Sequence, residues 1–328
     1  MFNKYRSIEN SYREKFLYFI KTEGFGDLEY VVQEKAHGSN LSYITTDGIN
    51  FSSAKRGSLI DEGETFYNHD KILQQLKPKF SNIWDKLKQT YSSLEQLTIF
   101  GEVIGGSYPH PDVKADNKSL KVQRGVFYSP TNEFYAFDIL INGDCYLDVD
   151  ETNSLFEQEN LLHAQTLFRG SLSDCLNYSN TFESTISSLL NLPEITPNIC
   201  EGTIVRPVIT SYLANDTRVI LKNKNEKFSE KNKVPKTKTE VTLSDKVAHL
   251  KELILAYVTE NRLDNVLSHM GEVTIKDMGK IIGLFSKDVV DDFSKDHEEE
   301  ISEIDKNELK FLRKSIAEKV RQLILKRL

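Results

Sequence analysis

A lysine at the end of a strand-like run stands out as a candidate nucleophile. Lys35 follows the apolar residues 30–32 and precedes the turn residue Gly38. An amine attacks only in its neutral form, and at pH 7 only about one free lysine in 2,500 is neutral. Burial or a neighbouring positive charge would lower the pKa of such a lysine and raise that fraction. The alternative is an ordinary exposed lysine, since most lysines lie at the surface.

A glutamate followed by glycine, Glu201-Gly202, offers a second group with chemical potential. A carboxylate supplies the hard oxygen that Mg²⁺ prefers, and glycine lets a backbone approach a ligand closely. Two common phosphate-binding loops are absent: G-x-x-x-x-G-K-[ST] does not occur, and residues 101–106 do not match the dinucleotide fingerprint. Those two routes of ATP binding are therefore excluded.

The elements that must position these residues are short strands with a few helices between them. Asp47-Gly48 joins two strand-like runs and predicts a hairpin. Apolar residues at helical spacing predict a helix over residues 70–88. The predicted strands are 40–46, 49–54, 97–104, 125–129, 134–141, 202–208 and 218–224, and further helices are predicted at 151–162 and 182–191.

The last quarter of the chain has a different pattern. Apolar residues recur at helical spacing over 243–258 and 307–328. Residues 225–240 have almost no apolar side chains and suit an exposed linker. We therefore expect one domain over residues 1–235 and a small all-helical domain over residues 241–328.

The composition is that of an ordinary globular protein. The 328 residues are 39% hydrophobic and 28% charged, with a mean hydropathy of −0.43, which excludes a disordered or membrane-spanning chain. Cys145, Cys175 and Cys200 form no C-x-x-C pair, so we expect neither disulfides nor a zinc site. The N-terminal residues show no apolar leader, so the expected compartment is the cytoplasm, including that of a host cell if a virus or phage encodes the protein.

The charge distribution is uneven. A net charge of −7 argues against indiscriminate binding of nucleic acid, which needs concentrated lysine and arginine. Residues 218–238 are an exception, with eight basic and two acidic side chains. Both a nucleic-acid contact and a solvated loop would explain this stretch.

Six short motifs occur in order between residues 35 and 224: Lys35-Ala-His37-Gly38-Ser-Asn40, Ala54-Lys55-Arg56-Gly57, Phe100-Gly101-Glu102, Phe134-Tyr135-Ala136-Phe137-Asp138, Glu201-Gly202-Thr-Ile-Val-Arg206-Pro207 and Leu221-Lys222-Asn223-Lys224. Each is weak alone, but the ordered set is specific, and it resembles the nucleotidyl-transfer motifs of the RNA ligase 2 family, which includes phage ligases and kinetoplastid RNA-editing ligases. His37 favours this family, because DNA ligases and capping enzymes usually have aspartate there. The resemblance extends to residues 257–272.

The resemblance implies an α+β fold: an ATP-grasp-like DNA/RNA ligase nucleotidyltransferase domain, with an ATP cleft between two antiparallel sheets, and then a helical domain. It implies an ATP-dependent RNA ligase that uses Mg²⁺ or Mn²⁺. Lys35 would form lysyl-AMP, AMP would pass to an RNA 5′-phosphate, and a 3′-hydroxyl would then displace AMP. The implied partner is RNA with 3′-OH and 5′-phosphate ends in a nicked duplex or templated junction. We expect a monomer without a membrane partner.

The resemblance also assigns residues to the site. Lys222 and Lys224 would assist Lys35, and their i, i+2 spacing puts both on one face of a strand. There they could lower the pKa of Lys35 and neutralise the α-phosphate during an in-line displacement. Glu201 would hold the metal. The residues implied to bind ATP or AMP are Glu34, Asn40, Arg56, Glu102, Phe137, Glu201, Lys222 and Lys224.

Three of these residues have a physical role that can be stated. Phe137 can stack on adenine, while Glu102 and Arg56 can hydrogen-bond ribose hydroxyls or a phosphate. The alternatives are core packing for Phe137 and surface ion pairing for the other two.

Candidate RNA contacts are Phe66, Tyr67 and Arg262. The aromatic pair resembles one that contacts terminal nucleotides in the family, and the alternative for it is core packing. Arg262 is a candidate phosphate contact, and its alternative is a helix cap or a salt bridge.

Two other functions share some of these features. An ATP-dependent DNA ligase or a GTP-using capping enzyme has the same fold but usually continues into a β-barrel OB module, and the helical pattern of 241–328 argues against that. A non-catalytic nucleic-acid-binding protein could use residues 218–238, but it would not need Lys35, Glu102 and Glu201 intact.

Overall fold

The computed structural model describes residues 2–229, 243–302, 304 and 306–327. The chain forms two compact units, Met1–Asn225 and Glu226–Leu328, each described below by itself. The domain boundary predicted between 235 and 241 lies outside the described residues and stays a prediction. The same holds for Lys231, Lys233, Lys236 and Lys238 of the basic stretch.

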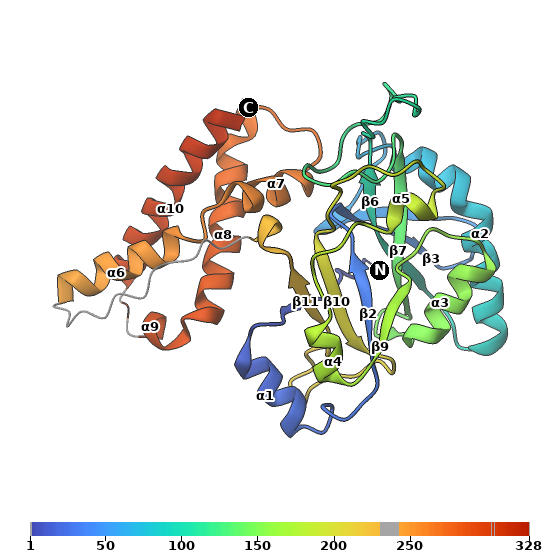
Figure 1. Cartoon of the computed structure of the whole chain (residues 1–328), viewed down its shortest axis with the longest axis horizontal. Coiled ribbons are helices and arrows are strands. Elements are labelled where there is room, and N and C mark those ends of the chain that lie inside the picture. Colours follow the sequence, from blue (N-terminus) through green and yellow to red (C-terminus); the bar gives the residue numbers. More distant parts are fainter. Residues whose placement is uncertain (1, 230–242, 303, 305, 328) are drawn as a thin grey trace. The chain divides into compact units, whose positions relative to one another are not determined.

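The first unit contains two sheets (Figure 1). All neighbouring strands are antiparallel except β1 and β11, which run parallel. The α+β fold is therefore confirmed. Sheet A has the order β1 (Glu9–Asn10), β11 (Leu221–Lys224), β10 (Gly202–Pro207), β2 (Tyr30–Lys35) and β9 (Thr166–Gly170); sheet B has the order β5 (Ser58–Leu59), β4 (Ser52–Lys55), β3 (Ser39–Thr45), β6 (Leu97–Gly105), β7 (Asn132–Ile141) and β8 (Cys145–Tyr146).

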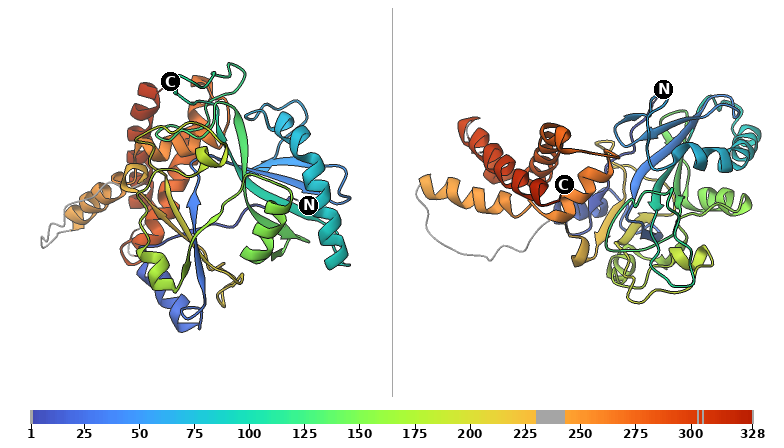
Figure 2. Two further views of the ribbon diagram at one scale, coloured as in Figure 1. Left: turned by 45° about the vertical axis from the view of Figure 1, so that its right-hand side comes forward. Right: turned by 90° about the horizontal axis from the view of Figure 1, so that it is seen from above.

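Helices bury one face of each sheet. On sheet B, α2 (His69–Thr90) and α3 (Val149–Gln158) contribute Phe80 and Phe156 to a large apolar core that includes Leu41. The two helices lie side by side over this sheet (Figure 2). On sheet A, the core is formed with α1 (Glu14–Thr22) and α4 (Leu172–Asn177).

The chain passes from sheet A to sheet B directly after Lys35. β2 ends at Lys35, and β3 begins at Ser39, so residues 36–38 are the connection. Gly38 is required there, because a Cβ atom would lie 2.4 Å from the carbonyl oxygen of Val103. The candidate nucleophile thus stands where the two sheets meet.

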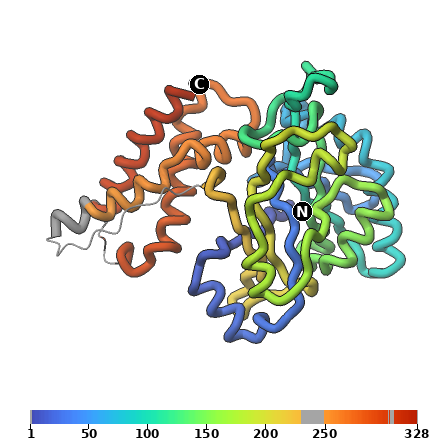
Figure 3. Tube along the Cα trace, in the orientation of Figure 1, coloured from blue at the N-terminus to red at the C-terminus, as the bar shows by residue number. Residues whose placement is uncertain are grey.

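Strands far apart in sequence complete sheet A. Glu9 pairs with Leu221 and Asn10 with Lys222, so the start of the unit lies beside its last strand (Figure 3). β10 lies between β11 and β2 and pairs with both. This order brings residues 35, 201 and 224 into one neighbourhood.

The described residues of the second unit form helices and no strand. Its core contains Ile254, Phe285, Phe293 and Ile316. No helix among the described residues combines the length and apolarity needed to cross a membrane. The helices are η1 (Glu226–Phe228), α6 (Leu243–Leu255), α7 (Glu260–Ser268), η2 (Ile275–Asp277), α8 (Met278–Asp296), α9 (Glu298–Ser302) and α10 (Lys306–Arg327).

Most predicted elements are present, but two predictions were wrong. Residues 125–129 form no strand, because Asn198 binds the backbone of Phe127 in place of a neighbouring strand. The helix predicted over 182–191 is reduced to α5 (Ile186–Leu189).

Candidate active site

The strand register places two lysines of the site on either side of one glycine. Gly202 of β10 pairs with Lys35 of β2 on one side and with Lys224 of β11 on the other. Gly202 has a φ of +150°, and a Cβ atom there would lie 2.2 Å from the carbonyl oxygen of Asn223. Only glycine lets the three strands approach in this way, which explains the Glu-Gly pair seen in the sequence.

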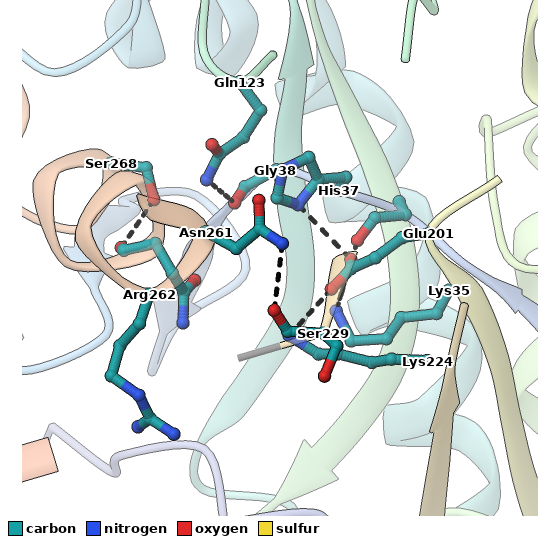
Figure 4. Close-up of polar contacts among 12 residues, drawn as sticks. Lys35, His37, Gly38, Gln123, Glu201, Lys224, Ser229, Asn261, Arg262 and Ser268 are labelled. Atoms are coloured by element: carbon teal, nitrogen blue, oxygen red, sulfur yellow. Dashed lines mark hydrogen bonds and ion pairs between the residues drawn. The ribbon is translucent and has the colours of Figure 1, made fainter. Parts of the chain in front are cut away.

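Glu201, which precedes this glycine, binds three basic side chains (Figure 4). Its Oε2 lies 2.7 Å from Nζ of Lys35 and 3.5 Å from Nδ1 of His37. Its Oε1 lies 3.0 Å from Nζ of Lys224. The structure therefore brings Lys35, Lys224 and Glu201 together as the motifs predicted, and it adds His37.

Glu201 as a whole residue is only 1% exposed. Burial by itself would raise its pKa, but the charges of Lys224, Lys35 and His37 hold the pKa well below its ordinary value. Glu201 is therefore ionised at neutral pH. It supplies the negative charge that the surrounding cations need when no other anion is bound.

The pKa of Glu102 is shifted in the opposite direction to that of Glu201. Glu102 lies in β6, opposite Asn40 of β3. Burial raises its pKa to about 7, although the charges of Lys35 and Arg56 oppose the rise. Its Oε2 is buried without a hydrogen-bond partner, so one oxygen is available to a ligand.

Asn40, Arg56 and Lys222, which the motifs also predict for the site, differ in solvent exposure. Asn40 is buried, Arg56 is exposed in the turn after β4, and Lys222 is half-buried. Lys222 lies on the same face of β11 as Lys224, two residues before it. A spacing of about 6.6 Å along the strand separates the two positions.

The carboxylate of Glu34 is held outside this centre. As the strand neighbour of Lys35 it points to the other face of β2. There it accepts hydrogen bonds from the hydroxyls of Ser184 (2.6 Å) and Thr185 (2.7 Å) and from the Thr185 N–H (2.8 Å). This side chain links β2 to the 184–185 turn, so a direct ATP contact through the carboxylate is not what the structure shows.

A bulge in β7 sets the direction of Phe137. Gly101 pairs with Ala136 and Phe100 with Asp138, so Phe137 has no partner in β6. An extra residue of this kind re-aims side chains. Phe137 is half-buried and packs edge-on against Tyr5, with ring centroids 5.0 Å apart.

Asp138, the next residue, joins the two sheets through an ion pair with Arg206 that the sequence analysis missed. Its carboxylate accepts hydrogen bonds from Arg206 (2.7 Å), Arg218 (2.6 Å) and Tyr5 (2.6 Å). Asp138 and Arg206 each stand in a predicted motif, but the motifs gave no signal that they pair. Arg218 is 3% exposed, so the solvated-loop interpretation of the basic stretch is wrong for this residue.

The structure places Phe66 and Tyr67 in their alternative role, core packing. Both side chains are buried in the core under α2, and their rings pack at 4.9 Å. A buried ring has no face left for a base, so the core-packing alternative holds.

Arg262 also takes its alternative role. It is 1% exposed and forms ion pairs with Asp288 and Asp292 of α8, while its Nε donates to the carbonyl of Tyr257. Its donors are engaged within the helical unit, so the structure favours the salt-bridge alternative over the expected phosphate contact. The acids that bind it lie about 26 to 30 residues away in sequence, and no motif pointed to them.

The carboxylates fit a metal bound jointly with a phosphate. Among the residues that the structure describes, no three His, Cys, Asp or Glu side chains form a complete metal cage. Mg²⁺ and Mn²⁺ at phosphoryl-transfer sites commonly use one or two carboxylates together with substrate phosphates and water. Glu201, with the unpartnered Oε2 of Glu102 on the neighbouring sheet, meets that requirement.

Comparisons with known proteins agree with this arrangement. Residues 28–224 match the RNA ligase family, and residues 241–322 match the C-terminal region of T4 RNA ligase 2. Two Trypanosoma brucei brucei proteins are similar: mitochondrial RNA-editing ligase 2, 28% identical over 89% of this chain and 83% of the relative, and mitochondrial RNA-editing ligase 1, 27% identical over 83% and 71%.

A solved structure of a Naegleria gruberi RNA ligase variant covers 70% of this chain, at 15% identity and a TM-score of 0.44, and this chain spans 58% of that protein. The family match over residues 28–224 includes all six motifs and the contacts of Lys35, Glu201 and Lys224. The chain therefore belongs to the RNA ligase family and is an RNA ligase.

Proposed function

We propose that the protein seals 3′-OH/5′-phosphate nicks in duplex or templated RNA at the expense of ATP, through lysyl-AMP and RNA-adenylate intermediates. The observation that carries this proposal is the contact of Glu201 with both Lys35 and Lys224 where the two sheets meet. The named relatives, which are RNA-editing ligases, support RNA as the substrate.

The first step uses Lys35 as the nucleophile. Its neutral Nζ attacks the α-phosphorus of ATP, a P–N bond forms, and the bond to pyrophosphate breaks as the amine loses a proton. Because an ion pair with a carboxylate favours the charged amine, Nζ must separate from Glu201 before it attacks. Arrival of ATP and metal at Glu201 would cause that separation.

The remaining steps transfer the activated phosphate. An oxygen of the RNA 5′-phosphate attacks the AMP phosphorus, the P–N bond breaks, and Lys35 regains its proton. The oxygen of a 3′-hydroxyl then attacks the 5′-phosphate, AMP leaves, and the hydroxyl proton passes to solvent. Each step is an in-line displacement, in which positioning and charge neutralisation provide most of the catalysis.

Each site residue has a proposed task in these steps. Lys224 and Lys222 neutralise the α-phosphate from one face of β11. Phe137 stacks on adenine, and Glu102, with Asn40 and Arg56 near it, binds the ribose or a phosphate. A divalent metal at Glu201 would reduce the charge on the phosphate oxygens.

The finer properties of the protein are part of the same proposal. We propose a monomer that acts in the cytoplasm and does not need a membrane. Size-exclusion chromatography with light scattering tests the oligomeric state, and fluorescence microscopy of a tagged protein tests the compartment.

Two assays test the reaction. Incubation with α-³²P-ATP and Mg²⁺ should label the protein covalently, and alkaline or acid treatment should distinguish the acid-labile P–N bond. Nicked duplex RNA, nicked duplex DNA and single-stranded RNA of one sequence are then compared under the same conditions. Preferential sealing of nicked RNA supports the proposal, whereas sealing of DNA alone or absence of covalent label contradicts it.

A further inference from the structure

The segment 105–128 carries none of the predicted catalytic residues, yet it binds the turn that follows Lys35. The hydroxyl oxygen of Tyr128 accepts a hydrogen bond from the backbone N–H of His37 at 2.8 Å. The side-chain amide of Gln123 donates to the carbonyl of Gly38 at 3.2 Å (Figure 4). Both side chains are buried. The turn is therefore held through a backbone donor and a backbone acceptor.

The same segment also binds the chain that leads to Glu201. The backbone N–H of Phe127 donates to Oδ1 of Asn198 at 2.8 Å, and Nδ2 of Asn198 donates to the carbonyl of Phe127 at 2.7 Å. Asn198 is buried and precedes Glu201 by three residues. One segment thus connects the residues after the nucleophile to the residues before its carboxylate partner.

The distance between nucleophile and carboxylate depends on this connection. Lys35 is the last residue of β2, and Glu201 immediately precedes the neighbouring strand β10, so each lies beside an irregular turn. Strand pairing alone fixes their backbones up to that point. The two turns beyond it are tied to one another through residues 123–128.

We propose that Tyr128 and Gln123 are positioning residues that fix the 36–38 turn and, through it, the placement of Nζ of Lys35. Neither side chain has a hydrogen bond to Lys35 or Glu201, so each acts through the backbone of His37 or Gly38. The inference rests on the proposed attack of Lys35 on ATP. A displacement of about 1 Å at a reacting group can lower a rate by about 100-fold, which is the effect expected when the turn is released.

Tyr128→Phe tests the proposal with the removal of a single oxygen. The hydrogen bond from the backbone N–H of His37 to the Tyr128 hydroxyl is then lost. We expect the rate constant for lysyl-AMP formation at saturating ATP to fall about 10- to 100-fold, with the ATP concentration at half-maximal rate unchanged. A general loss of packing would move both kinetic parameters and the thermal midpoint together.

Tyr108→Phe is the matched control. Tyr108 lies in the same segment, is buried, and donates its hydroxyl hydrogen bond to the carbonyl of Pro193, away from the 36–38 turn. We expect this variant to label at the wild-type rate. Gln123→Leu is the second test variant, because it removes the hydrogen bond to Gly38 and decides the matter if Tyr128→Phe does not fold.

The outcomes separate this inference from the proposed reaction. A wild-type protein that takes no covalent label contradicts the proposed reaction itself. If the wild type takes the label and Tyr128→Phe labels as fast as the wild type, the positioning role is overturned. If only Gln123→Leu folds, labelling of that variant at the wild-type rate overturns it in the same way. An equal slowing in Tyr108→Phe also overturns it, because the segment would then act only through its general stability. Slow labelling confined to the two test variants supports it.

Discussion

Asp138 of β7 and Arg206 of β10 form a buried ion pair, with Oδ1 and Nη1 2.7 Å apart, that joins the two sheets. The exposed fraction of Asp138 is zero, and Arg218 and Tyr5 share its carboxylate. Although burial by itself would raise the pKa of Asp138, the two arginines bring it to about 2. A charge buried so completely is retained only because its partners are present.

Asp138→Asn should therefore destabilise the first unit strongly. Two buried guanidinium groups would face a neutral amide, and loss of one partner from a buried pair costs about 3 to 5 kcal/mol. Denaturant unfolding at pH 7 measures the change. Asp150→Asn is the control, because Asp150 pairs with Arg169 at the surface, where such a pair contributes about 1 kcal/mol or less. Equal effects of the two substitutions would disprove a special role for the buried pair.

Lys35→Ala should abolish covalent labelling by α-³²P-ATP and the sealing of nicks that carry a 5′-phosphate. It should retain part of the activity on a strand that already carries a 5′-adenylate, since the final displacement does not use the amine. Denaturing gels of both substrates measure the two activities. Covalent labelling of the alanine variant at the wild-type level would rule out Lys35 as the nucleophile.

Lys222→Ala and Lys224→Ala should each slow lysyl-AMP formation at pH 7 by about 100-fold or more, as expected when one group that stabilises developing phosphate charge is removed. Lys222→Arg should restore activity only in part, because a guanidinium differs from an ammonium in shape and hydration. Single-turnover labelling measures the rates. Lys77→Ala on α2, which removes an exposed lysine, is the control, and near-normal labelling by both test variants would contradict the prediction.

Glu102→Gln should make the protein more stable than the wild type at pH 8 but not at pH 4.5. The folded-state pKa of Glu102 is about 7, above its ordinary value of 4.5, so the folded form holds the proton between these values. The contribution of Glu102 to the free energy of unfolding of the wild type therefore falls by about 2 to 3 kcal/mol as the pH rises through that range. Glutamine does not titrate, so the variant does not lose this stability. Thermal midpoints from pH 4.5 to 8 measure it. A difference that does not change with pH, as expected for the exposed control Glu62→Gln, would contradict the prediction.

Arg262→Ala should lower the thermal stability of the helical unit more than Arg313→Ala, which removes an exposed arginine of α10. Asp288 and Asp292 would lose their shared partner and face each other as like charges. Because the donors of Arg262 are used inside the unit, the Arg262→Ala variant should bind nicked RNA with the same salt dependence as the wild type. A slope that becomes shallower by about one unit would instead identify a phosphate contact.

The sequence was informative where function restricts the residue type. Lys35, Gly202 and Lys224 were all found from motifs, and the register of three strands explains why those types are needed there. Function could be inferred because each motif is local, and the fold class followed from their order.

The sequence was least informative where the surroundings of a side chain decide its role. Phe66 has an aromatic ring of the kind that stacks on bases, but its burial depends on a helix that follows it in the chain. Arg262 was assigned without knowledge of the acids in α8. Residues 125–129 have the apolar pattern of a strand, yet their backbone partner is the side chain of Asn198. Contacts of this kind join distant positions and leave no periodic signal in the sequence.

The parallel pairing of β1 with β11 bears on how the enzyme is made. Glu9 and Asn10 leave the ribosome more than 200 residues before their partners Leu221 and Lys222. Contacts of such large sequence separation form late in folding. A nascent chain that already displays Lys35 therefore lacks the strand that carries Lys224, and it gains the complete set of charges around Glu201 only after residue 224 has been synthesised. Catalytic competence is thus delayed until the sheet can close.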